Sequence, residues 1–123
     1  MNKLLLPVMT AAALYGAPVD ARPATPSAKA YVIAEITVRD PGAYEKYKAI
    51  IKPLVEKYGG QYLVRAGRVE AVDGAAPSGR VILLEFPSFA AAEAFEKSPA
   101  NLAAATIRHK AARSRLFIVE GAQ

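Results

Sequence analysis

Three segments of the chain are apolar at almost every position, and they limit the folds that it can adopt. These segments are residues 31–36, 81–84 and 116–119. Their β-branched and aromatic residues favour strands, and an unbroken apolar run is typical of a strand that is buried on both faces. The sequence therefore predicts a sheet that needs cover on each of its two sides.

The first of these strands, residues 31–38, is followed by a predicted helix. Asp40 can cap that helix with Pro41 in its first turn, and apolar residues recur at three- and four-residue spacing until Gly59-Gly60. Residues 61–65 then predict a second strand. Gly67 is the expected bulge, after which the strand resumes at residues 68–70.

The second half of the chain repeats the alternation of strand and helix. Residues 80–86 predict a third strand, and Ser88 is placed to cap the helix that follows it. Ser98-Pro99 restarts a helix that ends near Ala112. Residues 115–120 predict the last strand.

This order of elements, βαββαβ, predicts an α+β fold. With right-handed crossovers it gives the ferredoxin-like split βαβ arrangement, in which a four-stranded antiparallel sheet carries its helices on one face. The other apolar face would then be bare, and soluble monomers seldom expose several hundred Å² of apolar surface. We therefore expect a homodimer in which two sheets pack face to face as a dimeric α/β barrel.

The first 21 residues resemble an export signal. A basic start at Lys3 precedes the apolar residues 4–17, and Val19 and Ala21 are the small residues that a signal peptidase reads. We expect a signal peptide at 1–21, a flexible leader at 22–29 and one folded domain at 30–121, in the periplasm or secreted. A buried N-terminal helix of the domain is the alternative.

Composition narrows the classes of partner and site. The net charge of +5 invites a nucleic-acid role, but an exported protein rarely meets nucleic acid. The apolar run is shorter than the roughly 20 residues that span a bilayer, so we expect no membrane insertion of the mature domain. With no Cys and one His, disulfides and thiolate metal sites are excluded. We expect no metal and no cofactor.

Strand alternation suggests a site on the face of the sheet away from the helices. If Val32 and Ile82 face the helices, Glu35 and Glu85 project from neighbouring strands to the other side. By the same alternation Arg65 would project there from an edge strand. These three charges form either a buried ion network that fixes the register of the dimer or a ligand-binding or catalytic pocket.

A string of short motifs resembles the DUF1330 family, a domain of unknown function. The motifs are Tyr44-x-x-Tyr47, Lys57-Tyr58-Gly59-Gly60, Arg65-x-Gly67-x-x-Glu70, Glu85-Phe86-Pro87-Ser88-Phe89, Ser98-Pro99, Arg108 and Val119-Glu120-Gly121. The resemblance implies a dimeric α/β barrel and no agreed activity. The chain departs from the family pattern at Ala100 and Asn101, where Glu and Tyr are usual, and at Glu96, where the second of two aromatic residues is usual.

The end of the last helix carries two further candidates. Arg108 matches the family string, and the resemblance implies that it can anchor a substrate carboxylate; His109 is a candidate general base or axial haem ligand. Favourable interaction of cations with the helix dipole is the alternative explanation. Tyr44 and Tyr47 follow helical spacing and predict core packing, with a phenolic proton donor as the alternative.

Two functions follow from these observations. In the first, a non-enzymatic homodimer binds a small anionic or aromatic ligand through Arg65, Glu85 and Arg108. In the second, a cofactor-independent isomerase or monooxygenase-like enzyme uses Glu35 and Glu85 to transfer protons. Whether the protein is an enzyme stays open at this point.

Overall fold

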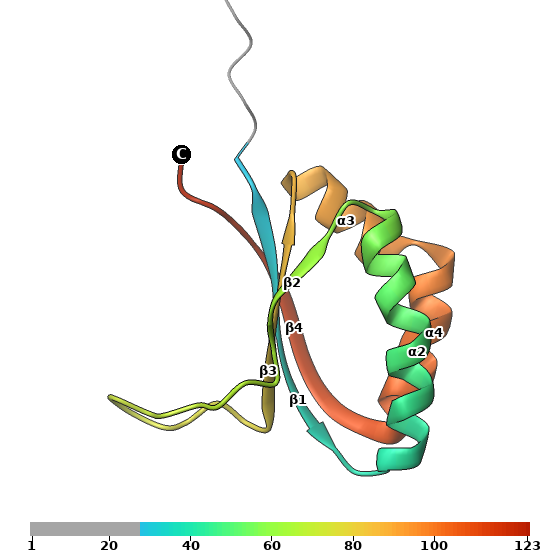
Figure 1. Ribbon diagram of the computed structural model, residues 1–123, viewed down its shortest axis with the longest axis vertical. Helices are drawn as coiled ribbons and strands as arrows, with labels where there is room; N and C mark the ends of the chain where they lie inside the picture. The colour runs from blue at the N-terminus through green and yellow to red at the C-terminus, as the bar shows by residue number, and fades with distance from the viewer. Residues whose placement is uncertain (1–27) are drawn as a thin grey trace, which may run out of the picture.

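A layer of helices lies against one face of a four-stranded sheet in the computed structural model, which describes residues 28–123 (Figure 1). The elements are β1 (Ala30–Val38), α2 (Pro41–Lys57), β2 (Gln61–Arg65), β3 (Arg80–Phe86), α3 (Phe89–Lys97), α4 (Pro99–Ala111) and β4 (Ala112–Glu120). The strands follow the order β2-β3-β1-β4, and every neighbouring pair is antiparallel. The predicted ferredoxin-like α+β fold is confirmed. The predicted signal peptide lies outside the described residues.

Side-chain caps explain where the helices begin. The Asp40 carboxylate accepts a hydrogen bond from the Ala43 N–H at 3.1 Å, and Pro41 occupies the first turn of α2. Such a cap satisfies an N–H group that has no partner inside the helix. α2 continues through Pro53 and ends before Gly59, whose φ of +83° favours glycine.

A single serine separates α3 from α4. The Ser98 hydroxyl oxygen accepts a hydrogen bond from the Asn101 N–H at 3.1 Å, and Pro99 occupies the first turn of α4. Ser88 caps α3 in the same way, through the Ala91 N–H at 3.0 Å. Both caps agree with the sequence prediction. The chain then enters β4 directly at Ala112, three residues earlier than expected.

The core lies between the sheet and the helices, and it follows the predicted alternation. Val32, Ala34 and Ile36 of β1 are buried, as are Ile82, Leu84 and Phe86 of β3. The ring centroids of Phe86 and Phe95 lie 5.2 Å apart, which joins the sheet to α3. The face that points toward the helices was therefore predicted correctly for the two central strands.

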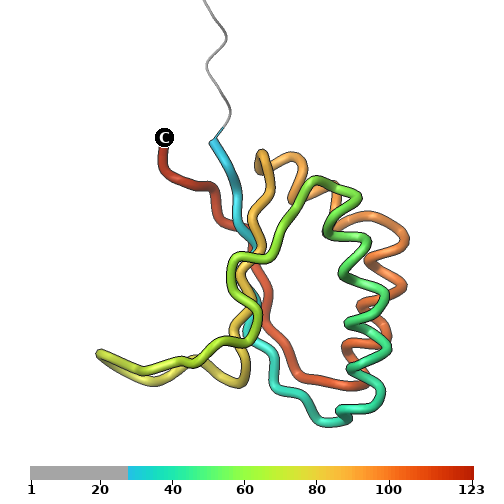
Figure 2. Tube along the Cα trace, in the orientation of Figure 1, coloured from blue at the N-terminus to red at the C-terminus, as the bar shows by residue number. Residues whose placement is uncertain are grey.

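The edge strand β2 differs from the prediction. Its bulge lies between Tyr62 and Val64 rather than at Gly67, and no strand resumes at residues 68–70. Ala66 has a φ of +59°, a left-handed conformation that turns the chain out of the sheet. Residues 66–79 then form a long irregular connection that projects away from the sheet (Figure 2).

This connection, which we call the 66–79 loop, returns to the sheet through Gly79. Gly79 has a φ of +71°, and a Cβ at that position would overlap the carbonyl oxygen of Ile36. Glycine is required there for both its conformation and its size. The close approach fixes Arg80 as the first residue of β3.

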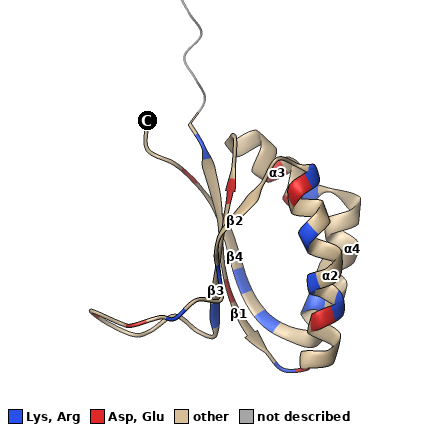
Figure 3. Cartoon of the chain, viewed as in Figure 1, with Lys and Arg blue, Asp and Glu red and all other residues tan. Residues whose placement is uncertain are grey.

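Basic and acidic residues are mixed along α2 (Figure 3). Lys52 forms an ion pair with Glu56 at 2.8 Å, and Lys48 forms one with Glu45 at 3.0 Å. The positive net charge of the chain is therefore not collected into one basic stripe along this helix. Within residues 28–123, no helix has the length and apolarity needed to cross a membrane.

Candidate functional site

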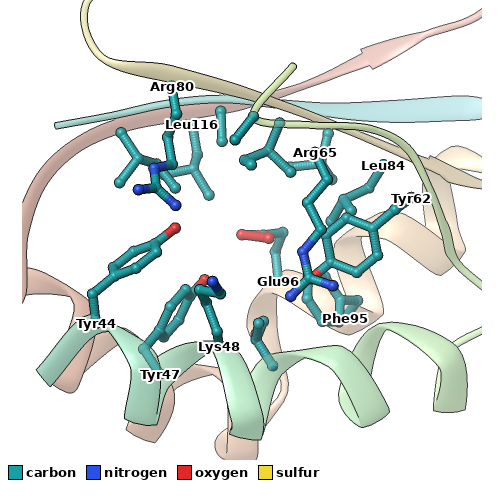
Figure 4. A pocket seen from close by; sticks show the side chains of 16 residues that line it. Tyr44, Tyr47, Lys48, Tyr62, Arg65, Arg80, Leu84, Phe95, Glu96 and Leu116 are labelled. Carbon is teal, nitrogen blue, oxygen red and sulfur yellow. The ribbon is translucent and has the colours of Figure 1, made fainter. Parts of the chain in front are cut away.

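A cavity of about 180 Å³ lies between the helix-facing side of the sheet and helices α2 and α3 (Figure 4). Its apolar lining comes from the sheet, from α2 and from α3. These residues are Val32, Ala34, Ile36, Ile51, Ala66, Ile82, Leu84, Phe95 and Leu116. An apolar cavity of about 150 Å³ is large enough to hold benzene. The cavity therefore has room for a small ligand with a single ring.

The polar lining of the cavity is rich in tyrosine and in basic residues. It consists of Tyr44, Tyr47 and Tyr62, the cations Lys48, Arg65 and Arg80, and one acid, Glu96. Lys48 is paired with Glu45, whereas Arg65 and Arg80 have no ion-pair partner within the described residues. An apolar pocket with a few convergent polar groups is the usual form of a small-molecule site.

Two of the arginines lie over tyrosine rings of the cavity. The Arg65 guanidinium carbon is 4.4 Å from the centroid of the Tyr62 ring, and that of Arg80 is 5.0 Å from the Tyr44 ring. Cation–π contacts of this kind orient the guanidinium while leaving its N–H donors free at the edge. Both arginines are held so that they can pair with an anion in the cavity.

Arg108 lies behind the third tyrosine and does not line the cavity. It is 7% exposed, and it donates hydrogen bonds to the Tyr47 hydroxyl oxygen at 3.0 Å and to the Ser114 hydroxyl oxygen at 3.2 Å. Because Tyr47 accepts the hydrogen bond from Arg108, its own hydroxyl proton remains available to a ligand. The sequence predicted that Arg108 contacts the ligand directly. In the structure, Tyr47 lies between Arg108 and the cavity.

The phenols of the cavity hold their protons at neutral pH. Burial raises the pKa of Tyr44 and of Tyr62 above the usual value. Burial also raises the pKa of Tyr47, although the positive charge of Arg108 opposes the effect. All three hydroxyl groups can therefore act as hydrogen-bond donors.

Glu96 supplies the carboxyl group of the cavity lining. Its carboxyl group points into the cavity (Figure 4), and burial raises its pKa while the charge of Arg108 opposes the rise. Within the described residues, no hydrogen bond contributes to the pKa of this group. A partly desolvated carboxylate without a donor is more basic than an exposed one.

The predicted grouping of Arg65 with Glu35 and Glu85 is wrong, and the bulge in β2 is the reason. Tyr62 pairs with Leu84 and Arg65 pairs with Ile82, and both partners face the helices. The extra residue shifts the alternation by one position. Arg65 therefore enters the cavity on the helix side, whereas the two glutamates lie on the other face.

The two glutamates share that face, as predicted, but they do not form a pair. Glu85 lies opposite Tyr31, four positions along β1 from Glu35, a separation of about 13 Å at the usual rise of a strand. Glu35 pairs with Arg115 and accepts a hydrogen bond from the Ser78 N–H at 3.2 Å.

Glu85 is also paired on that face. It accepts hydrogen bonds from Gln61 at 3.0 Å and from Lys29 at 3.3 Å. These contacts lower the pKa of Glu85, and the hydrogen bonds from Arg115 and Ser78 lower that of Glu35. Neither carboxylate is therefore suited to taking up a proton near neutral pH.

His109 is also remote from the cavity. Its side chain is exposed in the last turn of α4, and its carbonyl oxygen accepts a hydrogen bond from Arg39 at 3.4 Å. Among residues 28–123, no three His, Cys, Asp or Glu side chains gather where they could hold a metal ion.

Several cavity residues were missed although the sequence carried a signal for some of them. Arg80 has the same strand parity as the buried Ile82, which already places it on the helix side. Lys48 follows Tyr44 by four residues and so shares a helical face with it. Tyr62 has the strand parity opposite to that of Arg65, which already predicted it on the helix side, and Glu96 follows the buried Ala92 by four residues on α3.

Comparisons with known proteins agree on the fold. Residues 29–122 match the model of a family described as "Domain of unknown function (DUF1330)". A protein of unknown function from Rhodopseudomonas palustris, RPA0582, is 23% identical with a TM-score of 0.59, covering 79% of this chain and 85% of that chain. Its methylated form gives 20% identity, a TM-score of 0.63, and coverage of 79% and 83%.

An enzyme also shares the fold. SnoaB, a cofactor-independent oxygenase from Streptomyces nogalater, is 16% identical with a TM-score of 0.53, covering 79% of this chain and 96% of that chain. Likeness at this level of identity establishes a common fold and no common chemistry. No curated protein matches the chain.

Proposed function

The chain belongs to the DUF1330 family, a domain of unknown function, and we propose from its cavity that it binds a small aromatic anion. One observation carries the proposal. Three basic side chains and three protonated tyrosines converge on an apolar space that fits one ring. The apolar lining favours a ring, and the basic groups favour a carboxylate attached to it.

The position of the bound anion follows from the arginines. Arg65 and Arg80 each present a planar fork of N–H donors, and such a fork pairs with a carboxylate through two parallel hydrogen bonds. Both guanidinium groups are already oriented by tyrosine rings. Pre-orientation reduces the conformational entropy that binding would cost.

Arg65→Met is expected to weaken the binding of an aromatic carboxylate such as benzoate by about 10- to 100-fold, since a charge-assisted hydrogen bond contributes about 1.5–3 kcal/mol. Binding is measured by isothermal titration. Within the described residues Arg65 has no ion-pair partner, so the melting temperature should change little. Arg68→Met, in the exposed 66–79 loop, is the matched control. Unchanged affinity in Arg65→Met would contradict the proposal.

We also propose that the protein acts as a homodimer. The sheet face away from the helices, which we call the open face, carries an apolar row that crosses all four strands. Paired residues place Val64, Leu83, Ile33 and Phe117 side by side in that row. Phe117 is 40% exposed, and the same face of a second copy would cover the row about a twofold axis.

Export is the remaining part of the proposal, and it rests on residues 1–21 alone. The order of basic start, apolar run and small residues predicts cleavage after Ala21. The mature chain isolated from a periplasmic or secreted fraction should therefore begin at Arg22, as intact-mass spectrometry would show. A cytoplasmic product that retains Met1 would contradict it.

A further inference from the structure

Glu96 is the acid of the cavity lining, and the proposed binding of an anion gives it no role. A carboxylate opposes anion binding by repulsion, so its presence among basic groups requires another explanation. Figure 4 shows the Glu96 carboxyl group and the Tyr44 hydroxyl group pointing into the same space. The cavity therefore brings together a carboxylate, a phenol donor and guanidinium groups.

These three kinds of group are the ones that enolisation of a 2-oxo acid needs. A cation holds the carboxylate of the substrate, a hydrogen-bond donor stabilises the oxygen on which negative charge develops, and a base takes the proton from carbon. We infer that the cavity catalyses keto–enol tautomerisation of a 2-oxo acid that carries an aromatic ring, with Glu96 as the proton acceptor and donor. This inference rests on the proposed binding function.

The proposed step is balanced without a cofactor. The Glu96 carboxylate takes a proton from the carbon next to the ketone, and the C–H electron pair becomes the C=C bond. The carbonyl π electrons move to the oxygen, where the Tyr44 hydroxyl stabilises the enolate by a hydrogen bond. Transfer of that proton from Glu96 to the enolate oxygen gives the enol and restores the Glu96 carboxylate, whereas its return to carbon restores the ketone.

The surroundings of Glu96 agree with this role. Burial raises its pKa, and a more basic carboxylate removes a carbon-bound proton more effectively. The ionisable groups that face it from the packed elements are Tyr44, Tyr47 and Lys48 of α2, Tyr62 and Arg65 of β2, Arg80 of β3 and Arg108 of α4. Among these groups, the positive charge of Arg108 opposes the rise in the pKa of Glu96.

The test uses phenylpyruvate in D₂O and follows loss of its C3 proton signal by ¹H NMR. Because buffers also catalyse the exchange, rates are extrapolated to zero buffer concentration. The wild-type protein should accelerate exchange, and Glu96→Gln should lower the protein-dependent rate by about 100-fold or more, the usual contribution of a general base. Glu93→Gln is the matched control, since Glu93 lies on the same helix and pairs with Lys97 at 3.0 Å.

Binding measured on the same samples separates the two proposals. If Glu96→Gln binds phenylpyruvate at least as tightly as the wild type and loses exchange, Glu96 acts on the proton rather than on the fold. If the wild type binds phenylpyruvate without accelerating exchange, or if Glu96→Gln exchanges at the wild-type rate, the inference is overturned and the binding function stands. If the wild type does not bind phenylpyruvate, the inference is also overturned, and retained binding of benzoate would show that the anion site itself survives.

The pH profile provides a further readout. The exchange rate should rise with pH as Glu96 loses its proton. Because burial raises the pKa of Glu96, this rise should occur at a higher pH than for an exposed glutamate. A rate that does not depend on pH through this range would also overturn the inference.

Discussion

Leu83→Asp should dissociate the proposed homodimer or unfold it. Leu83 lies in the middle of the apolar row of the open face, between Val64 and Ile33. A carboxylate placed there in a dimer would be buried without a partner, which costs several kcal/mol. In light scattering at low micromolar concentration, the wild type should give about twice the chain mass and Leu83→Asp should give a monomer or an unfolded chain.

A matched control comes from the 66–79 loop. Val72 is 92% exposed, so Val72→Asp introduces the same charge without burying it and should leave the mass of the assembly unchanged. A wild-type protein that is monomeric and folded under these conditions would disprove the proposed dimer. So would a Leu83→Asp variant that remains a dimer with unchanged stability.

Phe86→Ala should lower the free energy of unfolding by about 3–5 kcal/mol, the range measured for large aromatic residues removed from a core. Phe86 is fully buried and packs on Phe95. The Phe86 ring also lies directly against Gly60, which has no side chain, and a Cβ at that position would lie 2.6 Å from the ring. Because close packing surrounds the ring on several sides, the neighbours have little freedom to collapse into the cavity that the substitution leaves.

Denaturant unfolding at constant protein concentration measures this loss as a lower midpoint with an unchanged slope. Phe89→Ala is the control, since Phe89 is 37% exposed at the start of α3 and should contribute much less. Equal losses for the two variants would show that the Phe86 ring is not the centre of the core.

Much of the fold could be predicted because its rules are local. Asp40, Ser88 and Ser98 begin helices through hydrogen bonds within three residues of the chain, and alternation along β1 and β3 identifies the buried face. The bulge of β2 was misplaced because glycine is common at bulges, whereas the extra residue lies between Tyr62 and Val64. Every residue of that segment is apolar or aromatic, so no change of pattern marks the shift.

The candidate site was harder to predict because it depends on packing between elements. Arg65 was correctly singled out, but its predicted neighbours were taken from the wrong face. Glu96 shares a helical face with the buried Ala92, but it joins the cavity only because α3 packs against β1, β3 and β4 and brings that face beside the cavity residues of α2 and β2. The spacing of residues within α3 does not encode this packing. Local patterns give the residues of a single element, and they do not give the angle between two elements.

Because of the bulge, the number of residues in β2 determines which of its side chains enter the cavity. Inserting one residue between Val64 and Arg65, with the rest of the ladder kept, would shift the alternation by one position and turn Arg65 toward the face that carries Glu85. No residue type would change, yet the cavity would lose a cation. In this strand an insertion or deletion, rather than a substitution, is the mutation that redistributes charge between the two sides of the sheet. Related chains that differ by an insertion or a deletion in β2 are therefore expected to bind different ligands.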